Sequence, residues 1–188
     1  MKPWMTLLGI LGFICFFIAD FNDRKMHEKL LSWSFSCGAV MLAAAVLLQL
    51  SFLQDTVLHG FWLIALILLL SAGCFIMLIK CLFFSFPASD AYCEPGKIRP
   101  VYDKEMYGIC RHPGFWWMLF LMIGLSLIAE FPVSSLVIYT ICNLLLILYE
   151  DRIVFPEILS GYEQYKKRVP FLIPALSRKR SFKRGEQR

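Results

Sequence analysis

Five uncharged apolar runs dominate the sequence and restrict what the chain can fold into. They cover residues 3–19, 30–54, 56–79, 113–129 and 131–149, with lengths of 17, 25, 24, 17 and 19 residues. A helix rises about 1.5 Å per residue, so roughly 20 residues cross a hydrocarbon core about 30 Å thick. We therefore predict an all-α, polytopic membrane protein with about five transmembrane helices, of which the first and fourth have marginal length.

The connections between the runs refine this prediction. The last two runs are separated only by the charged residue Glu130, and the helix breaker Pro132 follows it. This indicates a tight helical hairpin. The first run lacks a small-residue cleavage site and is followed by the polar residues 20–23. We therefore expect a retained helix here rather than a signal peptide.

Composition argues against a water-soluble globule, because 59% of the 188 residues are hydrophobic and only 18% are charged. The net charge of +5 equals that of residues 178–188, which hold six basic and one acidic side chain. Nucleic-acid binding usually requires a basic face, so we expect no nucleic-acid partner. We interpret the tail at 178–188 as a disordered topology signal with affinity for anionic headgroups of membrane lipids.

The distribution of Lys and Arg predicts the orientation of the chain. Basic residues cluster in 20–29, in 80–112 and after Tyr149, whereas the other ends of the runs carry only Lys2. Five spans with the N-terminus outside place 18 of the 19 basic residues in the cytoplasm, in agreement with the positive-inside rule. We therefore predict a cytoplasmic C-terminus and a functional site that faces the cytoplasm.

Metal and nucleotide motifs are missing from the sequence. No two of the seven cysteines have a CxxC spacing, and the three histidines are far apart. We predict no metal site and interpret most cysteines as small apolar packing residues. The chain also has no Walker loop and no GxGxxG motif.

The predicted cytoplasmic material forms two segments, residues 81–112 and 150–188. Prolines and a glycine punctuate the first segment, so we expect an irregular loop. Such a long loop beside a membrane domain is usually functional.

The second segment is expected to hold a C-terminal helix. Pro156 suits a helix start, Tyr162 and Tyr165 lie three residues apart on one helical face, and Pro170 and Pro174 end the helix. We interpret the two tyrosines as a lid or scaffold that packs on the membrane side of this helix.

Two charged clusters stand at the ends of predicted spans. Arg111-His112-Pro113 precedes the fourth span, and Glu150-Asp151-Arg152 follows the fifth. Each has a simple explanation: the first is an interfacial anchor beside a belt of two tryptophans, and the second is a charged stop. Charged residues at a membrane boundary can equally form a functional site, so both interpretations stay open here.

The order and spacing of these clusters resemble a known family. The residues concerned are Tyr107, Arg111-His112-Pro113, Phe115, Glu150-Asp151, Tyr162, Tyr165, Val169-Pro170 and Pro174. The pattern is similar to integral-membrane methyltransferases, a group that includes isoprenylcysteine carboxyl methyltransferase and phospholipid N-methyltransferases. The resemblance covers roughly residues 92–174, and it implies a single membrane domain over 1–177 whose cofactor-binding part is 92–174.

The resemblance implies an enzyme that uses S-adenosylmethionine, held by the loop, the entrance of the hairpin and the C-terminal helix. It places catalytic roles at Arg111 and Glu150. It places cofactor contacts at Arg99, Pro100, Val101, Tyr102, Tyr107, His112, Pro113, Gly114, Phe115 and Glu150. These residue types suit a ligand with a zwitterionic end, ribose hydroxyls, an adenine face and a sulfonium. We expect His112 and Glu150 at a solvated edge, and Arg111 either in contact with ligand or bracing Glu150 or a lipid phosphate.

Several positions depart from the family pattern. Leu146 stands where the prenylcysteine enzymes have an arginine that holds the acceptor carboxylate, and Glu105 replaces a glycine two residues before Tyr107. Ile158-Leu159 replaces Phe-Gly, and Phe115 replaces a tyrosine. The changes at Leu146 and Glu105 argue against a prenylcysteine substrate, and the other two mark the chain as a divergent relative of the family it resembles. The expected acceptor is a lipophilic or amphipathic carboxylate, amine or thiol that reaches the site from the bilayer.

Two other functions fit the same architecture. NADPH-dependent sterol reductases also carry an RHP-like stretch, but residues 114–117 do not match their usual continuation, Asn-Tyr-x-Gly-Glu. A non-catalytic membrane scaffold would use the charged clusters only as anchors. Binding of S-adenosylhomocysteine, of NADPH or of neither separates the three interpretations.

Overall fold

The computed structural model describes residues 3–51, 60–84, 98–129 and 131–173. Within them it is mostly helical, which confirms the predicted helical class. Its long helices are α1 (Pro3–Phe21), α2 (Ser34–Ser51), α3 (Phe61–Ile79), α5 (Pro113–Ala129) and α6 (Val133–Tyr149). Each lies on one of the five apolar runs. The tail at 178–188, Pro174 and residues 92–97 lie outside the described residues.

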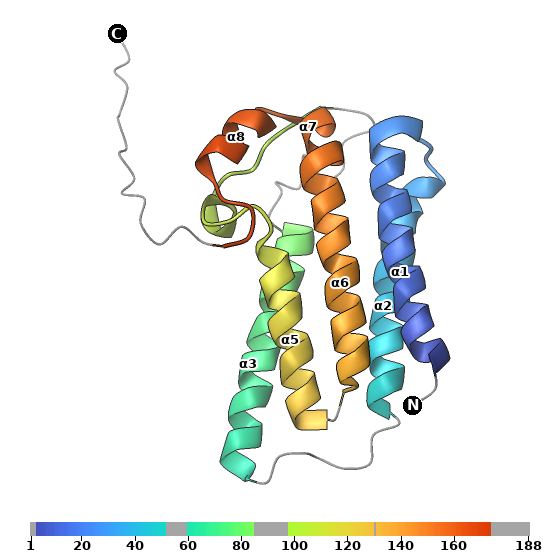
Figure 1. Ribbon diagram of the computed structural model, residues 1–188, viewed down its shortest axis with the longest axis vertical. Helices are drawn as coiled ribbons and strands as arrows, with labels where there is room; N and C mark the ends of the chain where they lie inside the picture. The colour runs from blue at the N-terminus through green and yellow to red at the C-terminus, as the bar shows by residue number, and fades with distance from the viewer. Residues whose placement is uncertain (1–2, 52–59, 85–97, 130, 174–188) are drawn as a thin grey trace.

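The five helices form a bundle in which successive helices alternate in direction (Figure 1). α2 packs on α1 and α3 packs on α5, while α6 contacts both α1 and α5 and so joins the two pairs. Figure 1 also shows α3 and α5 displaced along the bundle relative to α1, α2 and α6. The short helices α7 (Phe155–Ile158) and α8 (Tyr162–Arg168) lie together at one end of the bundle.

Four described helical segments are long and apolar enough to cross a membrane: Pro3–Met26, Leu31–Ser51, Phe61–Leu82 and Val133–Ile158. The apolar helix Pro113–Ala129 is shorter. Large apolar side chains on α3 are open to the surroundings, with Phe61, Trp62 and Leu69 71–83% exposed. Exposed apolar area of this kind suits a lipid environment. Four apolar helices thus indicate a membrane protein. The prediction of five spans counts the shorter helix Pro113–Ala129 in addition to these four.

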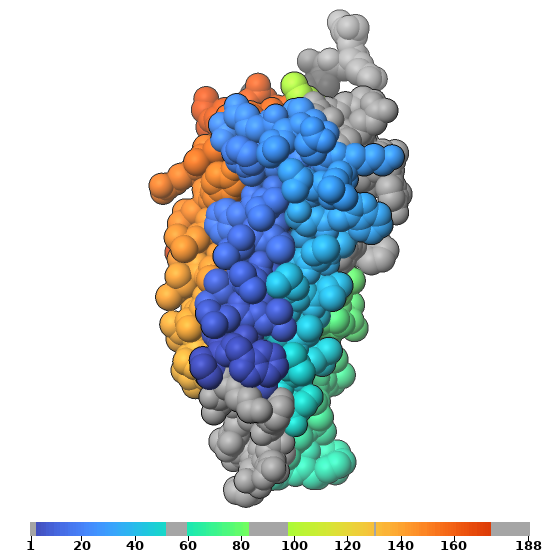
Figure 2. All heavy atoms as spheres, turned by 90° about the vertical axis from the view of Figure 1, so that its right-hand side faces the viewer, coloured from blue at the N-terminus to red at the C-terminus, as the bar shows by residue number. Residues whose placement is uncertain are grey.

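Close backbone contact explains how α1 and α2 run side by side over one face of the molecule (Figure 2). A Cβ built on Gly12 would lie 2.9 Å from the carbonyl oxygen of Gly38, and one on Gly38 would lie 2.7 Å from that of Gly12. Small residues at helix crossings are typical of membrane proteins because they let the backbones approach. These two glycines therefore set the distance between α1 and α2.

Gly38→Ala is expected to destabilise the protein by about 1–3 kcal/mol, because the added methyl group meets backbone that cannot move aside without shifting a helix. The measurement is the thermal melting temperature of the detergent-purified protein. Gly73→Ala on α3 is the matched control, since a Cβ there meets nothing within 4 Å. Equal melting temperatures for the two variants would contradict the assigned close contact.

A buried polar network fixes α6 against α1 and α2. The Tyr139 side chain on α6 is fully buried. Its hydroxyl accepts a hydrogen bond from Gln49 Nε2 at 2.9 Å and donates to the Met5 carbonyl oxygen at 3.3 Å. The hydroxyls of Thr6 and Ser135 lie 2.9 Å apart. Polar groups buried in a bundle need such partners, so this network favours one arrangement of these three helices.

Short elements connect the helices at the end that carries α7 and α8. Two-residue strands β1 (Arg99–Pro100) and β2 (Leu159–Ser160) pair in parallel. π-helical turns cover Asn22–Met26, Lys80–Phe84 and Glu150–Val154, and 3₁₀ turns cover Leu31–Trp33 and Glu105–Gly108. The predicted irregular loop thus contains a short strand and a 3₁₀ turn within its described part.

The prediction of one helix from Pro156 to the terminal prolines is wrong. The chain leaves the helical conformation at Leu159, which is extended and pairs with β1. Gly161 then adopts φ of +79°, a left-handed conformation that glycine accepts readily, before α8 begins. The break turns α8 onto the end of the bundle instead of letting it continue from α7.

Candidate functional site

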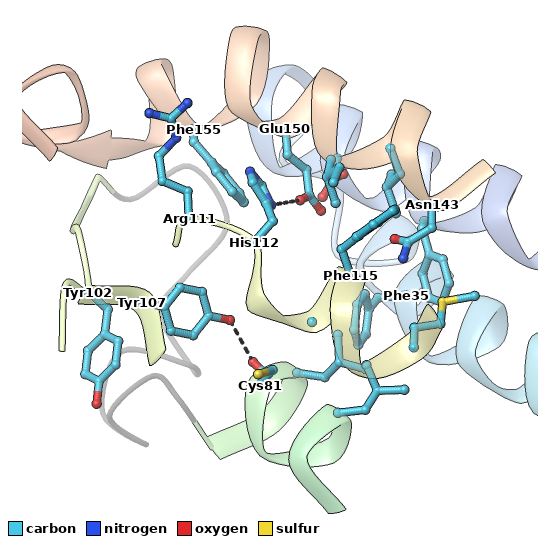
Figure 3. Close-up of a pocket in the computed structure, with 18 of the residues that line it drawn as sticks. Phe35, Cys81, Tyr102, Tyr107, Arg111, His112, Phe115, Asn143, Glu150 and Phe155 are labelled. Carbon is cyan, nitrogen blue, oxygen red and sulfur yellow. Dashed lines mark hydrogen bonds and ion pairs between the residues drawn. The ribbon is translucent and has the colours of Figure 1, made fainter. Parts of the chain in front are cut away.

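A cavity of about 280 Å³ lies between the helical bundle and the C-terminal segment that contains α7, β2 and α8. Its volume is close to the lower end of the range for small-molecule sites, about 300 Å³. Apolar side chains from all five long helices line its inner part, among them Phe13, Leu42, Leu78, Met118 and Leu146. Polar and aromatic side chains gather at the other end (Figure 3). The cavity is therefore amphipathic.

Arg111 fastens the start of α5 to the C-terminal segment. Its Nε and Nη2 lie 2.7 and 3.1 Å from the two carboxylate oxygens of Asp151, and its Nη1 donates to the carbonyl oxygens of Lys166 and Val169. Its backbone N–H donates to the Pro170 carbonyl oxygen at 3.0 Å. The side chain points away from Glu150 (Figure 3). Of the alternatives left open by the sequence, the geometry shows a brace, with Asp151 as the partner instead of Glu150 or a lipid phosphate.

The two tyrosines of α8 are buried and hydrogen-bonded toward the site. Tyr162 donates to Asp151 Oδ1 at 2.6 Å, and Tyr165 donates to the backbone oxygen of Tyr107 at 2.7 Å. Burial raises the pKa of both phenols, and the Asp151 carboxylate raises that of Tyr162 further. Both residues also line the cavity. The expectation that they pack on the membrane side of their helix is therefore wrong, because α8 turns them toward the bundle.

Tyr162→Phe is expected to destabilise the protein by about 1.5–3 kcal/mol and Tyr165→Phe by about 0.5–1.5 kcal/mol. The difference arises because Tyr162 donates to a carboxylate, whereas Tyr165 donates to a neutral carbonyl group. Thermal melting of both variants in the same detergent tests the order. A larger loss for Tyr165→Phe would contradict the role given to the Tyr162–Asp151 contact.

His112 is enclosed between aromatic rings. Its side chain is 6% exposed, it stacks on Phe155 with 9° between the ring planes, and it meets the Phe171 ring edge-on. Burial lowers the pKa of the imidazole, which is therefore neutral near pH 7, although Asp151 opposes the shift. Nε2 lies 3.6 Å from Asp151 Oδ1 and has no hydrogen-bond partner among the described residues. The expected solvated edge is thus wrong for His112.

Glu150 faces His112 across the polar end of the cavity, with Oε2 3.5 Å from the imidazole Nδ1 (Figure 3). It begins the π-helical turn that continues α6, so it points into the cavity while the adjacent Asp151 points to Arg111. The side chain of Glu150 is 20% exposed and that of Asp151 is 8% exposed. The two neighbouring acids therefore serve different contacts.

Sequence reasoning missed two polar residues of the cavity, Asp20 and Asn143. Asp20 comes from the last turn of α1, and its Oδ2 is buried with no hydrogen-bond partner among the described residues. Asn143 lies two helical turns before Glu150, on the same face of α6. The signals were present: an amide inside an apolar run, and an acid directly after the first run.

Only some of the residues that the resemblance assigns to the cofactor line the cavity. Seven of the ten line the cavity: Val101, Tyr102, Tyr107, His112, Gly114, Phe115 and Glu150. Arg111, to which the resemblance gives a catalytic role, lines it as well. The other three of the ten are not among its lining residues. Arg99 pairs with Asp23, Pro100 lies in β1 opposite Ser160, and Pro113 is buried where α5 begins. The loop contributes rings as well, since Tyr102 and Tyr107 meet edge to face at 5.9 Å.

Glu105 occupies a strained backbone position beside the cavity. Its φ of +51° lies in the left-handed region, which favours glycine. Its carboxylate pairs with Lys80 at 2.9 Å, an exposed contact that offsets little of the strain. The glycine of the family pattern would therefore be unstrained at this position, whereas the glutamate that replaces it is strained.

No group of three or more His, Cys, Asp or Glu side chains suited to a metal ion occurs in the part of the chain that the structure describes. No protein-family model, no curated protein and no solved structure matches this chain. The residues of the cavity are therefore the basis for any statement about function.

Proposed function

We propose that this protein is a membrane-embedded methyltransferase that moves a methyl group from S-adenosylmethionine to a lipophilic or amphipathic acceptor. The amphipathic cavity carries this proposal. Its polar end lies at the end of the bundle where α7 and α8 sit, and its apolar part is lined by all five long helices. A site of this shape suits a reaction between a polar cofactor and an acceptor that resides in the bilayer.

The residues at the polar end fit the proposed cofactor. Buried Oδ2 of Asp20 has no hydrogen-bond partner among the described residues, so it can contact a ligand. Tyr107 and Phe155 provide aromatic surface for a flat base, and Glu150 provides an acceptor for ribose hydroxyls or an ammonium group. When bound, S-adenosylmethionine supplies a methyl group on a positively charged sulfur, which acts as an activated leaving group.

The chain itself contributes position and exclusion of water. Arg111, Asp151 and Tyr162 hold α8 and the C-terminal segment over the cavity. The neutral, buried imidazole of His112 is fixed between two aromatic rings, so its orientation is set before a ligand binds. Alignment of reactants in a dry site is the main requirement for displacement at an activated methyl group.

The proposal includes entry of the acceptor from the bilayer, and the apolar lining that α2 and α3 contribute to the cavity supports it. α2 packs on α1 and α3 packs on α5, while Leu42 of α2 and Leu78 of α3 both line the cavity. The proposal includes five spans with the N-terminus outside and the C-terminus and polar end in the cytoplasm. A C-terminal reporter active only on the outer face would contradict this orientation.

Isothermal titration of the detergent-purified protein tests the proposed function. We expect binding of S-adenosylhomocysteine and no binding of NADPH. Binding of NADPH alone would identify a reductase, and binding of neither would identify a scaffold. Glu163→Gln changes an exposed residue of α8 outside the cavity lining, and it should bind S-adenosylhomocysteine as the unsubstituted protein does.

A further inference from the structure

Asn143 places an amide inside the apolar part of the cavity. The residue lies within α6, in the segment Val133–Ile158 that is long and apolar enough to cross a membrane, and its side chain lines the cavity. The amide points from α6 toward the side of the cavity that holds Phe35 and Phe115 (Figure 3). Neither the proposed cofactor contacts nor the fastening of the C-terminal segment uses this side chain.

The amide of Asn143 makes no hydrogen bond within the part of the chain that the structure describes. Other polar side chains inside the long helices have partners: Thr140 donates to the Leu136 carbonyl oxygen at 2.8 Å, and Ser126 donates to the Met122 carbonyl oxygen at 3.0 Å. An amide away from water is unfavourable unless it is hydrogen-bonded, and polar residues in membrane spans commonly mark a binding site. Asn143 therefore indicates that a ligand supplies the missing partner.

The surroundings of Asn143 are apolar. Leu146 and Ile147 follow it along the lining face of α6, and apolar side chains of the other four long helices complete the inner part of the cavity. Among the described lining residues, Asn143 is the one polar side chain that a long helix contributes from its interior, because the others come from helix ends, connecting segments and α8. A ligand that fills this part must therefore be largely apolar and carry a hydrogen-bonding group opposite Asn143.

The chemistry of an amide restricts which group that is. The amide has two N–H donors and an acceptor oxygen, and it carries no charge. A charged ligand group beside it would be buried among apolar side chains without an opposite charge, which is unfavourable. A carbonyl group accepts from the amide N–H groups but leaves the amide oxygen without a donor. A hydroxyl group both donates and accepts, so it satisfies both sides of the amide.

We propose that Asn143 recognises an uncharged hydroxyl group carried within the apolar part of a lipophilic ligand. Seven residues of helix lead from Asn143 to Glu150, which places this hydroxyl group about 10 Å from the polar end of the cavity. As a feature of the methyl acceptor, the inference rests on the proposed function. As a binding site it does not, because the unpaired amide and its apolar surroundings are independent of any reaction.

Asn143 is then a specificity-determining residue. An unsubstituted alkyl or isoprenyl chain in the inner part of the cavity leaves the amide unpaired, whereas a hydroxylated chain pairs with it. A site built to hydrogen-bond a hydroxyl group rejects an analogue that lacks it, because the polar group of the site is then buried without a partner. The cavity thus favours a hydroxylated amphiphile over one with a plain hydrocarbon chain.

Two uncharged probes of matched length test the inference. Decane-1,10-diol has hydroxyl groups that can lie at Asn143 and at the polar end, and n-dodecane has the same number of heavy atoms without oxygen. Both are titrated into detergent-purified protein without cofactor, and affinities are measured by calorimetry. We expect Asn143→Leu to weaken diol binding at least about tenfold, or roughly 1.4 kcal/mol, and not to weaken dodecane binding. Unchanged diol affinity, equal losses for the two probes, or no diol binding to the unsubstituted protein would overturn the proposal.

Thr140→Val is the matched control for this substitution. Thr140 lies one turn before Asn143 on α6, is outside the cavity lining and donates to its own helix, so its substitution should change the affinity for neither probe. Asn143→Leu should melt at the same or a higher temperature, because it removes an unpaired amide from apolar surroundings and changes the volume little. A lower melting temperature would show that the amide holds the helices together, and would overturn its assignment to a ligand.

S-adenosylhomocysteine separates this inference from the proposed function. Asn143→Leu should bind it within about twofold of the unsubstituted protein. Loss of that affinity would assign Asn143 to the cofactor and overturn its role in hydroxyl recognition. Diol binding that depends on Asn143, without any binding of S-adenosylhomocysteine, would support the hydroxyl site and contradict the methyltransferase. Binding of S-adenosylhomocysteine with diol affinity unchanged by Asn143→Leu would contradict the hydroxyl site alone.

Discussion

Arg111→Gln is expected to be the most destabilising of the substitutions proposed for this protein. The Arg111 and Asp151 side chains are 10% and 8% exposed, so the substitution leaves an uncompensated buried carboxylate. Loss of one partner of such a pair costs about 3–5 kcal/mol. Two backbone carbonyl groups also lose a donor, which adds about 1 kcal/mol each. Thermal melting in detergent measures the loss.

Arg152→Gln is the matched control for this prediction. Arg152 follows Asp151 directly, carries the same charge and is exposed. Its substitution is expected to change stability by less than about 0.5 kcal/mol. If Arg111→Gln melted like Arg152→Gln but lost ligand binding, the arginine would be a ligand contact, and its assignment as a brace would be incorrect.

Glu150→Gln is expected to weaken binding of S-adenosylhomocysteine at least about tenfold, because an amide holds the ribose hydroxyls or the ammonium group of the ligand less strongly than a carboxylate does. The protein should still fold, since the Glu150 carboxylate makes one long contact with His112 and no strong ion pair among the described residues. The measurement is the dissociation constant of S-adenosylhomocysteine by calorimetry, together with the melting temperature of the variant.

Glu163→Gln serves as the control, because this residue of α8 is 67% exposed and lies outside the cavity lining. It should retain the affinity of the unsubstituted protein. A Glu150→Gln variant with unchanged affinity would show that Glu150 takes no part in binding the cofactor.

The positions of the long helices along the chain were predictable from the sequence, because hydropathy alone determines them. The fourth apolar run, residues 113–129, coincides with α5, because a proline begins it and charged or polar residues flank it. The run 30–54 extends beyond α2, since Leu31–Trp33 forms a 3₁₀ turn before the regular helix starts. Uncharged sequence marks the place of a helix better than it marks its ends.

Contacts within the site depended on packing that the sequence does not encode locally. Glu150 and Asp151 are adjacent acids, and only the rotation of α6 and its π-helical turn decides which of them faces Arg111. Asp20 and Asp23 pose the same problem at the end of α1, where one lines the cavity and the other pairs with Arg99. The turn at Gly161 was also missed, because glycine permits a left-handed conformation without requiring it.

The fastening of the C-terminal segment by Arg111 has a consequence for biosynthesis. Asp151, the carbonyl groups that Arg111 contacts and the rings that enclose His112 all belong to residues 151–171, which leave the ribosome after all five helices. During insertion the polar end of the cavity is therefore open, and Arg111 has no partner. We expect that newly made chains acquire ligand binding last, as a separate step after the helices have assembled in the membrane.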